Sequence, residues 1–268
     1  MARAQSASVA VIGGSGFYTF LGDAAEVEVS TPYGEPSALI SVGKVEGRSV
    51  AFLPRHGRHH ELPPHRINYQ ANIWALRSLG VRRVLAPCAV GGLTPDVVPG
   101  DLVVPDQLVD RTISRVQTYI DRGAAHVPFA DPYCPALRRV LCDSDTSTKD
   151  GGTMVVVEGP RFSTRAESRS FAAAGWSLVN MTGHPEAVLA RELGLCYATL
   201  ALVTDMDAGV DGHEVVDQAT VFARFAENLD VMRAVLRKAV GGLAPDQADQ
   251  GCDCAAWLED VTLPFELP

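Results

Sequence analysis

Two carboxylic acids placed two residues apart carry the clearest chemical signal in the sequence. Asp205 and Asp207 follow the apolar run 197–203, which predicts a strand whose end meets a ligand crevice. Alternate residues of an extended chain point the same way, so both carboxyl groups can face one site. Carboxyl groups this close shift each other's ionisation, and one can retain a proton near neutral pH. The pair predicts general acid chemistry, with a solvated acidic turn before Gly209 as the alternative.

A second chemical block is cationic and follows the apolar run 50–53. Residues 55–60 read Arg-His-Gly-Arg-His-His. Arg55 supplies a planar fork suited to phosphate, and His56 a further donor. A metal site shared by His56 and His60 is the alternative, but it needs a helix, and the glycine and nearby prolines argue against one. Phosphate contact by Arg55 and His56 is therefore the favoured interpretation.

Two glycine-containing loops follow predicted strands. In residues 13–16, Gly-Gly-Ser-Gly, backbone N–H groups can approach an anion closely while Ser15 adds a hydroxyl donor. Residues 87–92, Pro-Cys-Ala-Val-Gly-Gly, end another strand in the same way. Tight turns would explain both loops. A dinucleotide loop is disfavoured because the spacing is not G-x-G-x-x-G.

Phe162 and Met181 lie in polar segments rather than on apolar stripes. Phe162 is flanked by Pro160-Arg161 and Ser163, where its aromatic face suits stacking on a flat heterocycle. Core packing remains the alternative for both side chains. Glu186 follows a proline that opens a helix, and a favourable position beside the helix dipole is sufficient to account for it.

Composition and charge limit the classes of function. The 268 residues are 47% hydrophobic and 21% charged, as expected for one globular domain. A net charge of −9 disfavours binding to nucleic acid. No stretch resembles a secretory signal or a membrane span, so we expect a cytoplasmic protein without a membrane partner.

Six cysteines are scattered along the chain, and we expect reduced thiols. Cys252 and Cys254 could begin a metal site. Only two of the four tetrahedral ligands are visible there, however, and no histidine is near, so no metal is expected.

Apolar runs bounded by turn residues alternate with helical periods. The runs are residues 9–12, 38–42, 50–53, 84–87, 102–104, 154–157 and 197–203, and apolar side chains at helical spacing recur over 69–79 and 222–236. This alternation predicts an α/β fold: a single domain, residues 1–268, with a large central mixed β-sheet flanked by helices. Residues 241–253 are expected to form a loop. The apolar tail 254–268 should dock on this core or on a neighbouring subunit.

Taken together, five blocks lie in an order that resembles one known family. They are residues 11–17, 54–59, 158–168, 180–186 and 204–207, and the resemblance covers roughly residues 8–240. The chain resembles the 5′-methylthioadenosine phosphorylases, the trimeric branch of the purine nucleoside phosphorylase family. The resemblance implies phosphate-dependent cleavage of methylthioadenosine to adenine and 5-methylthioribose 1-phosphate, a glycosyl transfer in purine salvage.

The resemblance also implies roles for individual residues. Asp205 would protonate adenine N7, and Asp207 would accept from the exocyclic amino group. Phosphate would contact Ser15, Arg55, His56, Cys88, Ala89 and Thr182; the nucleoside would contact Phe162, Ser163, Met181, Asp205, Asp207, Val221 and, from a neighbouring subunit of a homotrimer, His126. Inorganic phosphate is a co-substrate, and no metal or organic cofactor is implied.

The sequence departs from the family pattern in three places. Cys88 stands where relatives often carry a hydroxyl residue, which weakens one phosphate contact. Gly183-His184 replaces a bulkier hydroxyl residue and a valine, so His184 either starts a helix or narrows the pocket. The tail is shorter than usual, which would leave the methylthio pocket more open.

Other functions stay open. A 6-oxopurine nucleoside or methylthioinosine phosphorylase is the nearest, although in those relatives the first carboxyl tends to become an amide. A nucleotide-binding regulatory or redox domain using residues 13–16 would bind a dinucleotide without phosphate-dependent turnover. A structural oligomerisation module would bind no ligand.

Overall fold

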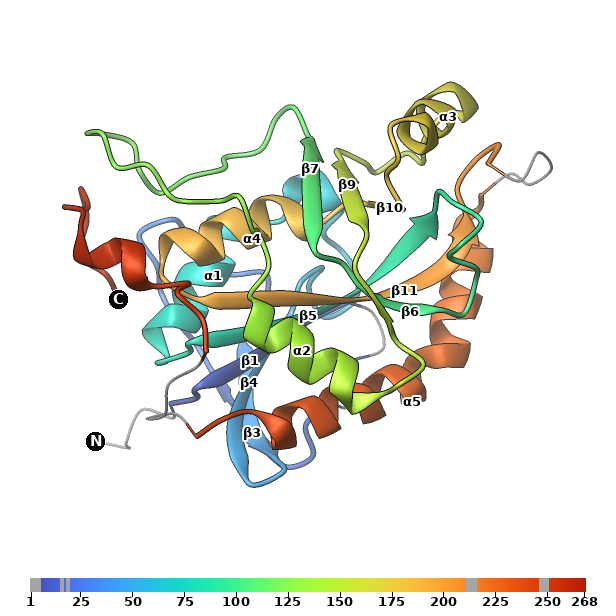
Figure 1. The fold of residues 1–268 in the computed structure, drawn as a ribbon. Coiled ribbons are helices and arrows are strands. Elements are labelled where there is room, and N and C mark those ends of the chain that lie inside the picture. Colours follow the sequence, from blue (N-terminus) through green and yellow to red (C-terminus); the bar gives the residue numbers. More distant parts are fainter. Residues whose placement is uncertain (1–5, 15–16, 18–19, 211–215, 246–250) are drawn as a thin grey trace.

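In a computed structural model the chain forms an α/β fold around one mixed sheet (Figure 1). The structure describes residues 6–14, 17, 20–210, 216–245 and 251–268. Within these residues the sheet has 11 strands, and its main path runs β2-β3-β4-β1-β5-β10-β9-β7. β11 pairs with β5 outside this path. The predicted fold class is confirmed.

Each predicted apolar run overlaps a strand, and four further segments are also strands. Their bounds are β1 Val9–Gly13, β2 Ala24–Val27, β3 Ile40–Val45, β4 Arg48–Pro54, β5 Arg83–Gly92, β6 Leu102–Val104, β7 Gln107–Arg111, β8 Lys149–Asp150, β9 Thr153–Val157, β10 Leu178–Asn180 and β11 Cys196–Met206. β2, β7, β8 and β10 were not predicted. β2 and β7 are exposed or only half-buried, while β8 and β10 have two and three residues, so none of them has a long apolar run.

Parallel pairing brings the carboxyl ends of several strands to one edge of the sheet. β1 is parallel to β4 and to β5, and β5 is parallel to β11 along nearly its whole length. Residues that follow these strands therefore meet, as in other open α/β sheets.

Helices cover both faces of the central strands (Figure 1). They are α1 Tyr69–Ser78, α2 Pro135–Ser144, α3 Arg165–Ala173, α4 Gly183–Glu192 and α5 Gln218–Gly242, with single 3-10 turns at Pro64–Arg66 and Ala256–Glu259. α1 packs on α4, and α2 packs on α5, with α4, α2 and α5 all contacting β11. No helix in the described ranges combines the length and apolar composition that a membrane crossing requires.

Burial on both faces explains why the central strands are largely apolar. On β11, Tyr197, Ala201 and Val203 belong to one core cluster. The intervening Ala198, Leu200 and Leu202 belong to the cluster on the opposite face. Both faces of the strand pack against apolar side chains, so apolar residues do not alternate with polar ones along the run.

The C-terminal tail docks on this chain's own core. Trp257 is buried and donates from Nε1 to the Arg191 carbonyl, 3.0 Å away. Phe265 packs its ring 5.7 Å from that of Trp74 and 6.0 Å from that of Tyr119. The loop predicted at 241–253 begins later than expected, because α5 continues to Gly242.

The cysteines are less scattered in space than in sequence. Cys134, Cys196, Cys252 and Cys254 come together in one cluster, so two cysteines distant in sequence join the pair Cys252 and Cys254 that the sequence showed. All six cysteines are unbonded to one another.

Candidate active site

A cavity of about 400 Å³ lies where the carboxyl ends of the parallel strands meet. Gly14 follows β1 and Arg55 follows β4. The C-terminal residues of strands β5 and β11 form the floor. The first turns of α5 cover it from one side. The sheet thus brings together segments nearly 200 residues apart in sequence.

Most of the predicted site residues line this one cavity: Arg55, His56, Cys88, Ala89, Phe162, Ser163, Met181, Thr182, Asp205, Asp207 and Val221. Ser15 lies outside the described residues, although the neighbouring Gly14 lines the cavity. His126 is exposed and is not among the lining residues.

Asp205 and Asp207 reach the cavity from the end of β11. A bulge between Val203 and Asp205 shifts the register against β5, so that Asp205 pairs with Gly91. Thr204 Oγ1 donates to Asp205 Oδ2 over 2.7 Å. Asp207 is buried, and one of its carboxyl oxygens, Oδ2, accepts from Ser168 Oγ at 2.6 Å. Each carboxyl is therefore oriented by a neighbouring hydroxyl.

Gly91 has no side chain, and this leaves space for the Asp205 and Asp207 side chains. A Cβ at this position would lie 3.2 Å from Asp205 Oδ1 and 2.9 Å from Val179 Cγ1. A side chain here would push Asp205 away from the cavity. The glycine near the end of β5 therefore also keeps the space that Asp205 occupies.

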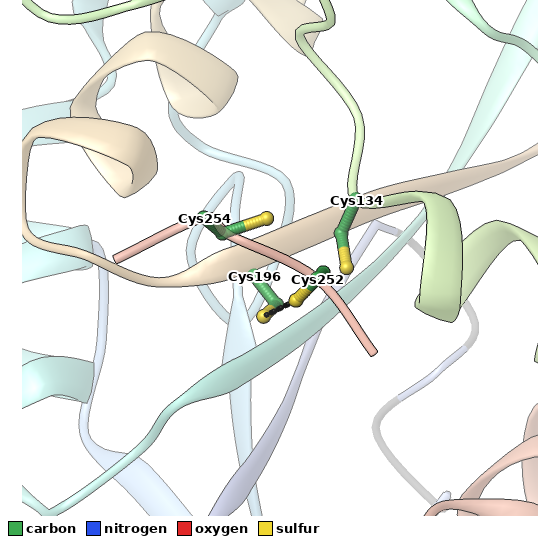
Figure 2. A group of neighbouring side chains, drawn as sticks. All are labelled: Cys134, Cys196, Cys252 and Cys254. Carbon is green, nitrogen blue, oxygen red and sulfur yellow. Dashed lines mark hydrogen bonds between the residues drawn. The ribbon is translucent and has the colours of Figure 1, made fainter. Parts of the chain in front are cut away.

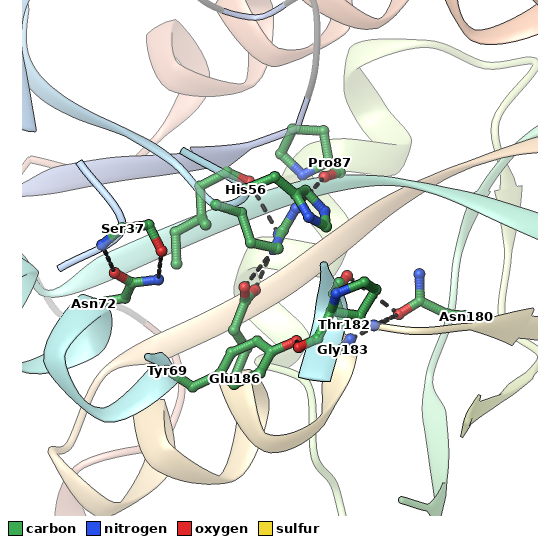
Figure 3. Close-up of polar contacts among 12 residues, drawn as sticks. Ser37, His56, Tyr69, Asn72, Pro87, Asn180, Thr182, Gly183 and Glu186 are labelled. Atoms are coloured by element: carbon green, nitrogen blue, oxygen red, sulfur yellow. Dashed lines mark hydrogen bonds and ion pairs between the residues drawn. The ribbon is translucent and has the colours of Figure 1, made fainter. Parts of the chain in front are cut away.

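Arg55 lies at the centre of a buried polar network at the opposite end of the cavity, and Figure 3 labels its partners Glu186 and Pro87. Its Nε and Nη2 donate to the two carboxylate oxygens of Glu186, and Nη2 also donates to Ile12 O at 3.1 Å. Nη1 donates to Pro87 O at 3.3 Å. Tyr197 donates its hydroxyl to Glu186 Oε2 at 2.9 Å. Arg55 is 2% exposed and Glu186 0%.

This network corrects two expectations. The planar fork of Arg55 was expected to face phosphate, but it is occupied by Glu186. Contacts within the described residues use four of the five guanidinium N–H groups, and the fifth, on Nη1, has no partner among those residues and can serve a ligand. Glu186 is more than a favourable charge at a helix start, because it neutralises a buried arginine. Burial disfavours the charged guanidinium, but the adjacent Glu186 carboxylate outweighs it and raises the pKa of Arg55.

His56 is neutral in this environment. Burial and the adjacent Arg55 charge lower its pKa from 6.5 to about 3. Its Nδ1 lies 2.9 Å from Leu62 O, and since a carbonyl oxygen only accepts, Nδ1 carries the hydrogen. Nε2 of the neutral ring is then an acceptor. His56 can therefore bind a protonated phosphate oxygen, or a fully ionised one after taking up a proton.

The other predicted phosphate-contacting groups in the described residues, Cys88, Ala89 and Thr182, carry no charge. Burial raises the pKa of the Cys88 thiol to about 12, so this side chain offers at most a weak S–H donor. Thr182 and Gly183 donate their backbone N–H groups to Asn180 Oδ1, both at 2.7 Å. Asn180 in turn donates to Ala89 O at 3.0 Å, which ties the start of α4 to β5.

The other side of the cavity is apolar and partly open. Phe162 and Met181 are half-buried, and both line it. Gly159, at φ +67°, lets Met181 approach, because a Cβ there would lie 2.7 Å from Met181 Sδ. The position of Met181 thus depends on a backbone conformation that favours glycine.

Several lining residues were missed by sequence reasoning. His60 stacks on His56, with ring centroids 4.4 Å apart, and meets Phe222 edge-on at 5.4 Å. Phe222, 42% exposed, and Phe225 line the cavity from α5. Their helical spacing gave no separate signal, because a helix that covers a pocket repeats its apolar residues as a core helix does.

His184 does not narrow the cavity. It is buried away from the lining residues, with Nε2 3.3 Å from Asp110 Oδ2, and its carbonyl accepts from Arg115. Of the two roles considered, a place near the start of α4 is the one that the structure supports.

Comparison with known proteins agrees with this geometry. The chain is 58% identical to the S-methyl-5′-thioadenosine phosphorylase of Mycobacterium tuberculosis over 259 residues, 96% of this chain and 97% of the relative. It is 55% identical to the purine nucleoside phosphorylase of Streptomyces coelicolor over 281 residues, covering 100% of both. A crystal structure of a methylthioadenosine phosphorylase from an antarctic soil metagenomic library superposes with a TM-score of 0.85 at 41% identity, covering 94% of this chain and 91% of that one. The family model described as "Phosphorylase superfamily" matches residues 8–240, and the chain belongs to this superfamily.

Proposed function

We propose that this protein cleaves S-methyl-5′-thioadenosine with inorganic phosphate to give adenine and 5-methylthioribose 1-phosphate. The observation that carries the proposal is the pair Asp205 and Asp207 at one end of a cavity whose other end holds anion donors. The names of the similar proteins support the same substrate.

Phosphate is placed beside Cys88, Ala89 and Thr182, within reach of the remaining N–H of Arg55. Because Glu186 cancels the Arg55 charge and His56 is neutral, the described part of this subsite binds by hydrogen bonds rather than by excess positive charge. The phosphate anion attacks C1′ while the ribosyl group develops oxocarbenium character, so its negative charge stabilises the transition state.

The base lies between Phe162 and the carboxyl pair. Asp205 donates a proton to N7, which makes adenine a better leaving group. The hydroxyl of Ser168 donates to Asp207 Oδ2 and orients this carboxyl group, whose oxygens accept from the exocyclic amino group. Turnover in this scheme uses no metal or organic cofactor, and added divalent metal or nucleotide cofactors should leave the rate unchanged.

One alternative has a specific observation in its favour. The Streptomyces relative, 55% identical, is named a purine nucleoside phosphorylase. A 6-oxopurine presents an acceptor at position 6, and an acceptor oxygen of Asp207 would repel it. An acid that donates at N7, together with a carboxyl oxygen that accepts from the amino group, favours the aminopurine.

The deciding experiment offers methylthioadenosine, adenosine and inosine to the purified protein, each with and without phosphate. We expect adenine release from methylthioadenosine only when phosphate is present. Equal release of adenine without phosphate would exclude phosphorolysis. Faster turnover of inosine than of methylthioadenosine would show that the preferred substrate is a 6-oxopurine nucleoside.

We also propose a homotrimer in which His126 of one subunit reaches the cavity of the next. The segment that follows β7 supports this: Ile113 is 88% and Val116 62% exposed, although both are apolar, and His126 is exposed on the same segment. Light scattering should give three times the chain mass of 28.6 kDa. His126→Ala should then raise KM for methylthioadenosine, whereas a fully active monomer would contradict the assembly.

A cytoplasmic location completes the proposal, because unpaired thiols are usual in reducing compartments. Cell fractionation with an antibody to the protein tests it.

A further inference from the structure

Four cysteines from three separate segments meet at the end of the sheet opposite to the active site (Figure 2). Cys134 caps α2, Cys196 begins β11, and Cys252 and Cys254 lie beyond α5. Their Sγ atoms all lie within 4.8 Å of one another, and those of Cys196 and Cys252 are 3.4 Å apart. Cys134, Cys196 and Cys254 are buried, and Cys252 is half-buried.

The spacing suits a tetrahedral ion. Zinc–thiolate bonds of about 2.3 Å place the four sulfurs about 3.8 Å apart, within the range found here. In two disulfides each sulfur would bond to one neighbour and leave the other two unused. In this cluster every sulfur is near all three others, which is the arrangement that one central ion requires.

We propose that Cys134, Cys196, Cys252 and Cys254 bind one zinc ion. Zinc binds cysteine as the thiolate, and Cys134 lies at the N-terminus of α2, where the positive end of the helix dipole favours a negatively charged ligand. Four protein ligands complete the tetrahedron and leave no position for water or substrate, so the site is structural rather than catalytic.

The location of the cluster also indicates a structural role. Cys196 and Asp205 are nine residues apart on one strand, which at about 3.3 Å per residue separates them by about 30 Å. The ion would instead fasten the C-terminal segment to the body of the protein. That segment contains Trp257, which donates to Arg191 O, and Leu258, which packs over Gly194.

The sequence alone showed only the Cys252–Cys254 pair. Cys196 lies 56 residues before Cys252, and Cys134 lies in a third segment, so no ligand spacing is recognisable along the chain. The four cysteines are brought together by the packing of the sheet and by the segment after α5, which returns to the start of β11.

The test measures the metal content of untagged protein prepared in reducing buffer from zinc-supplemented medium and then desalted. Elemental analysis should find about one zinc per chain, as a closed four-thiolate site predicts. Cys254→Ser and Cys134→Ser should each lose most of this zinc and unfold at a lower temperature. Cys142→Ser is the matched control, because Cys142 lies on α2 outside the cluster, and it should keep the zinc.

Cobalt(II) provides a readout that does not depend on the variants folding. Added to metal-depleted protein, it should give the intense absorption of tetrahedral cobalt thiolate. Six titratable thiols with no bound metal in the reduced protein would overturn the proposal. So would an intact mass that is lower by two hydrogens for each disulfide, with no metal present.

Discussion

The two ends of the cavity are built on opposite principles. At the phosphate end, Arg55 and Glu186 are almost completely buried, and nearly every donor and acceptor is already used within the protein. At the base end, Phe162, Met181 and Phe222 are half-buried or exposed and offer mainly apolar surface. Among the described residues at this end, the charged side chains are those of Asp205 and Asp207.

The difference follows from the cost of burying polar groups. An unpaired charge in a low-dielectric interior is expensive, so a buried polar site must be completed by the protein before the ligand arrives. Apolar surface carries no such requirement and can accept related bases. We therefore expect substitutions at the base end to change chemistry and selectivity, and those at the phosphate end to change stability and phosphate affinity.

The largest expected effect is on chemistry at the base end. Asp205→Asn keeps the shape and a donor but loses the transferable proton, so kcat/KM for methylthioadenosine should fall about 10²–10⁴-fold. Inosine-type substrates should suffer less, because an amide can donate to a 6-oxo group. Both substrates are assayed on both proteins at saturating phosphate.

Asp96→Asn is the control for this experiment, since Asp96 is an exposed carboxylate outside the cavity. An Asp205→Asn enzyme with undiminished turnover of methylthioadenosine would show that another group protonates the base. The comparison between the two ends would then lose its main support.

The next effect is on stability at the phosphate end. Glu186→Gln leaves the Arg55 guanidinium buried without a counter-charge, which should lower the free energy of unfolding by about 3–5 kcal/mol. The matched control is Glu192→Gln on the same helix. Glu192 is also buried, but it accepts from Thr118 and from the backbone of Tyr119 rather than from an arginine.

Urea denaturation of both variants at neutral pH measures the difference. A smaller loss for Glu192→Gln would attribute the cost to the orphaned arginine. Equal losses would mean that the position on α4 matters, and not the ion pair.

The sequence predicts the fold well where local pattern and burial agree. The strands buried on both faces, β1, β4, β5 and β11, are continuous apolar runs, and their parallel pairing gathers Arg55, Cys88 and Asp205 at one edge. The residue types and the order of these segments along the chain were enough to predict that Arg55, Cys88 and Asp205 line one cavity.

Pairings that depend on distance in sequence were not predictable. Glu186 and Arg55 are 131 residues apart, and the local reason for an acid at a helix start concealed the ion pair. Phe222 was read as part of a core-facing stripe, yet it faces the cavity because α5 extends over the end of β11. The cysteine cluster was missed for the same reason.

The third effect is a pH dependence at His56. The folded pKa is about 3, against 6.5 in the unfolded chain, so between these values the unfolded state binds more protons. This contribution to stability is present above pH 6.5 and is lost as pH falls toward 3. His56→Gln should remove that part of the decline, measured as melting temperature at a series of pH values.

Phosphate affinity should respond to pH in the opposite direction. Because neutral His56 has an acceptor at Nε2, the complex needs one proton on either phosphate or the ring. The KM for phosphate should therefore rise by up to about tenfold per pH unit above neutrality. His56→Gln offers an amide donor and should flatten this rise; an unchanged slope would mean that His56 does not contact phosphate.

The smallest effect tests how completely the phosphate end is built. Cys88 is buried and neutral, and a thiol is a weak donor, so Cys88→Ser should add a better hydrogen bond to bound phosphate. Because the thiol already offers a weak donor, the net gain from the hydroxyl should be about 0.5–1.5 kcal/mol, which corresponds to a decrease of about two- to tenfold in KM for phosphate. Without phosphate the buried hydroxyl lacks this partner, so phosphate should raise the melting temperature of Cys88→Ser more than that of the unaltered protein. Cys142→Ser, distant from the cavity, should change neither value. If Cys88→Ser also changes neither, phosphate does not lie beside β5, and the anion end of the cavity must be assigned to the loop after β1.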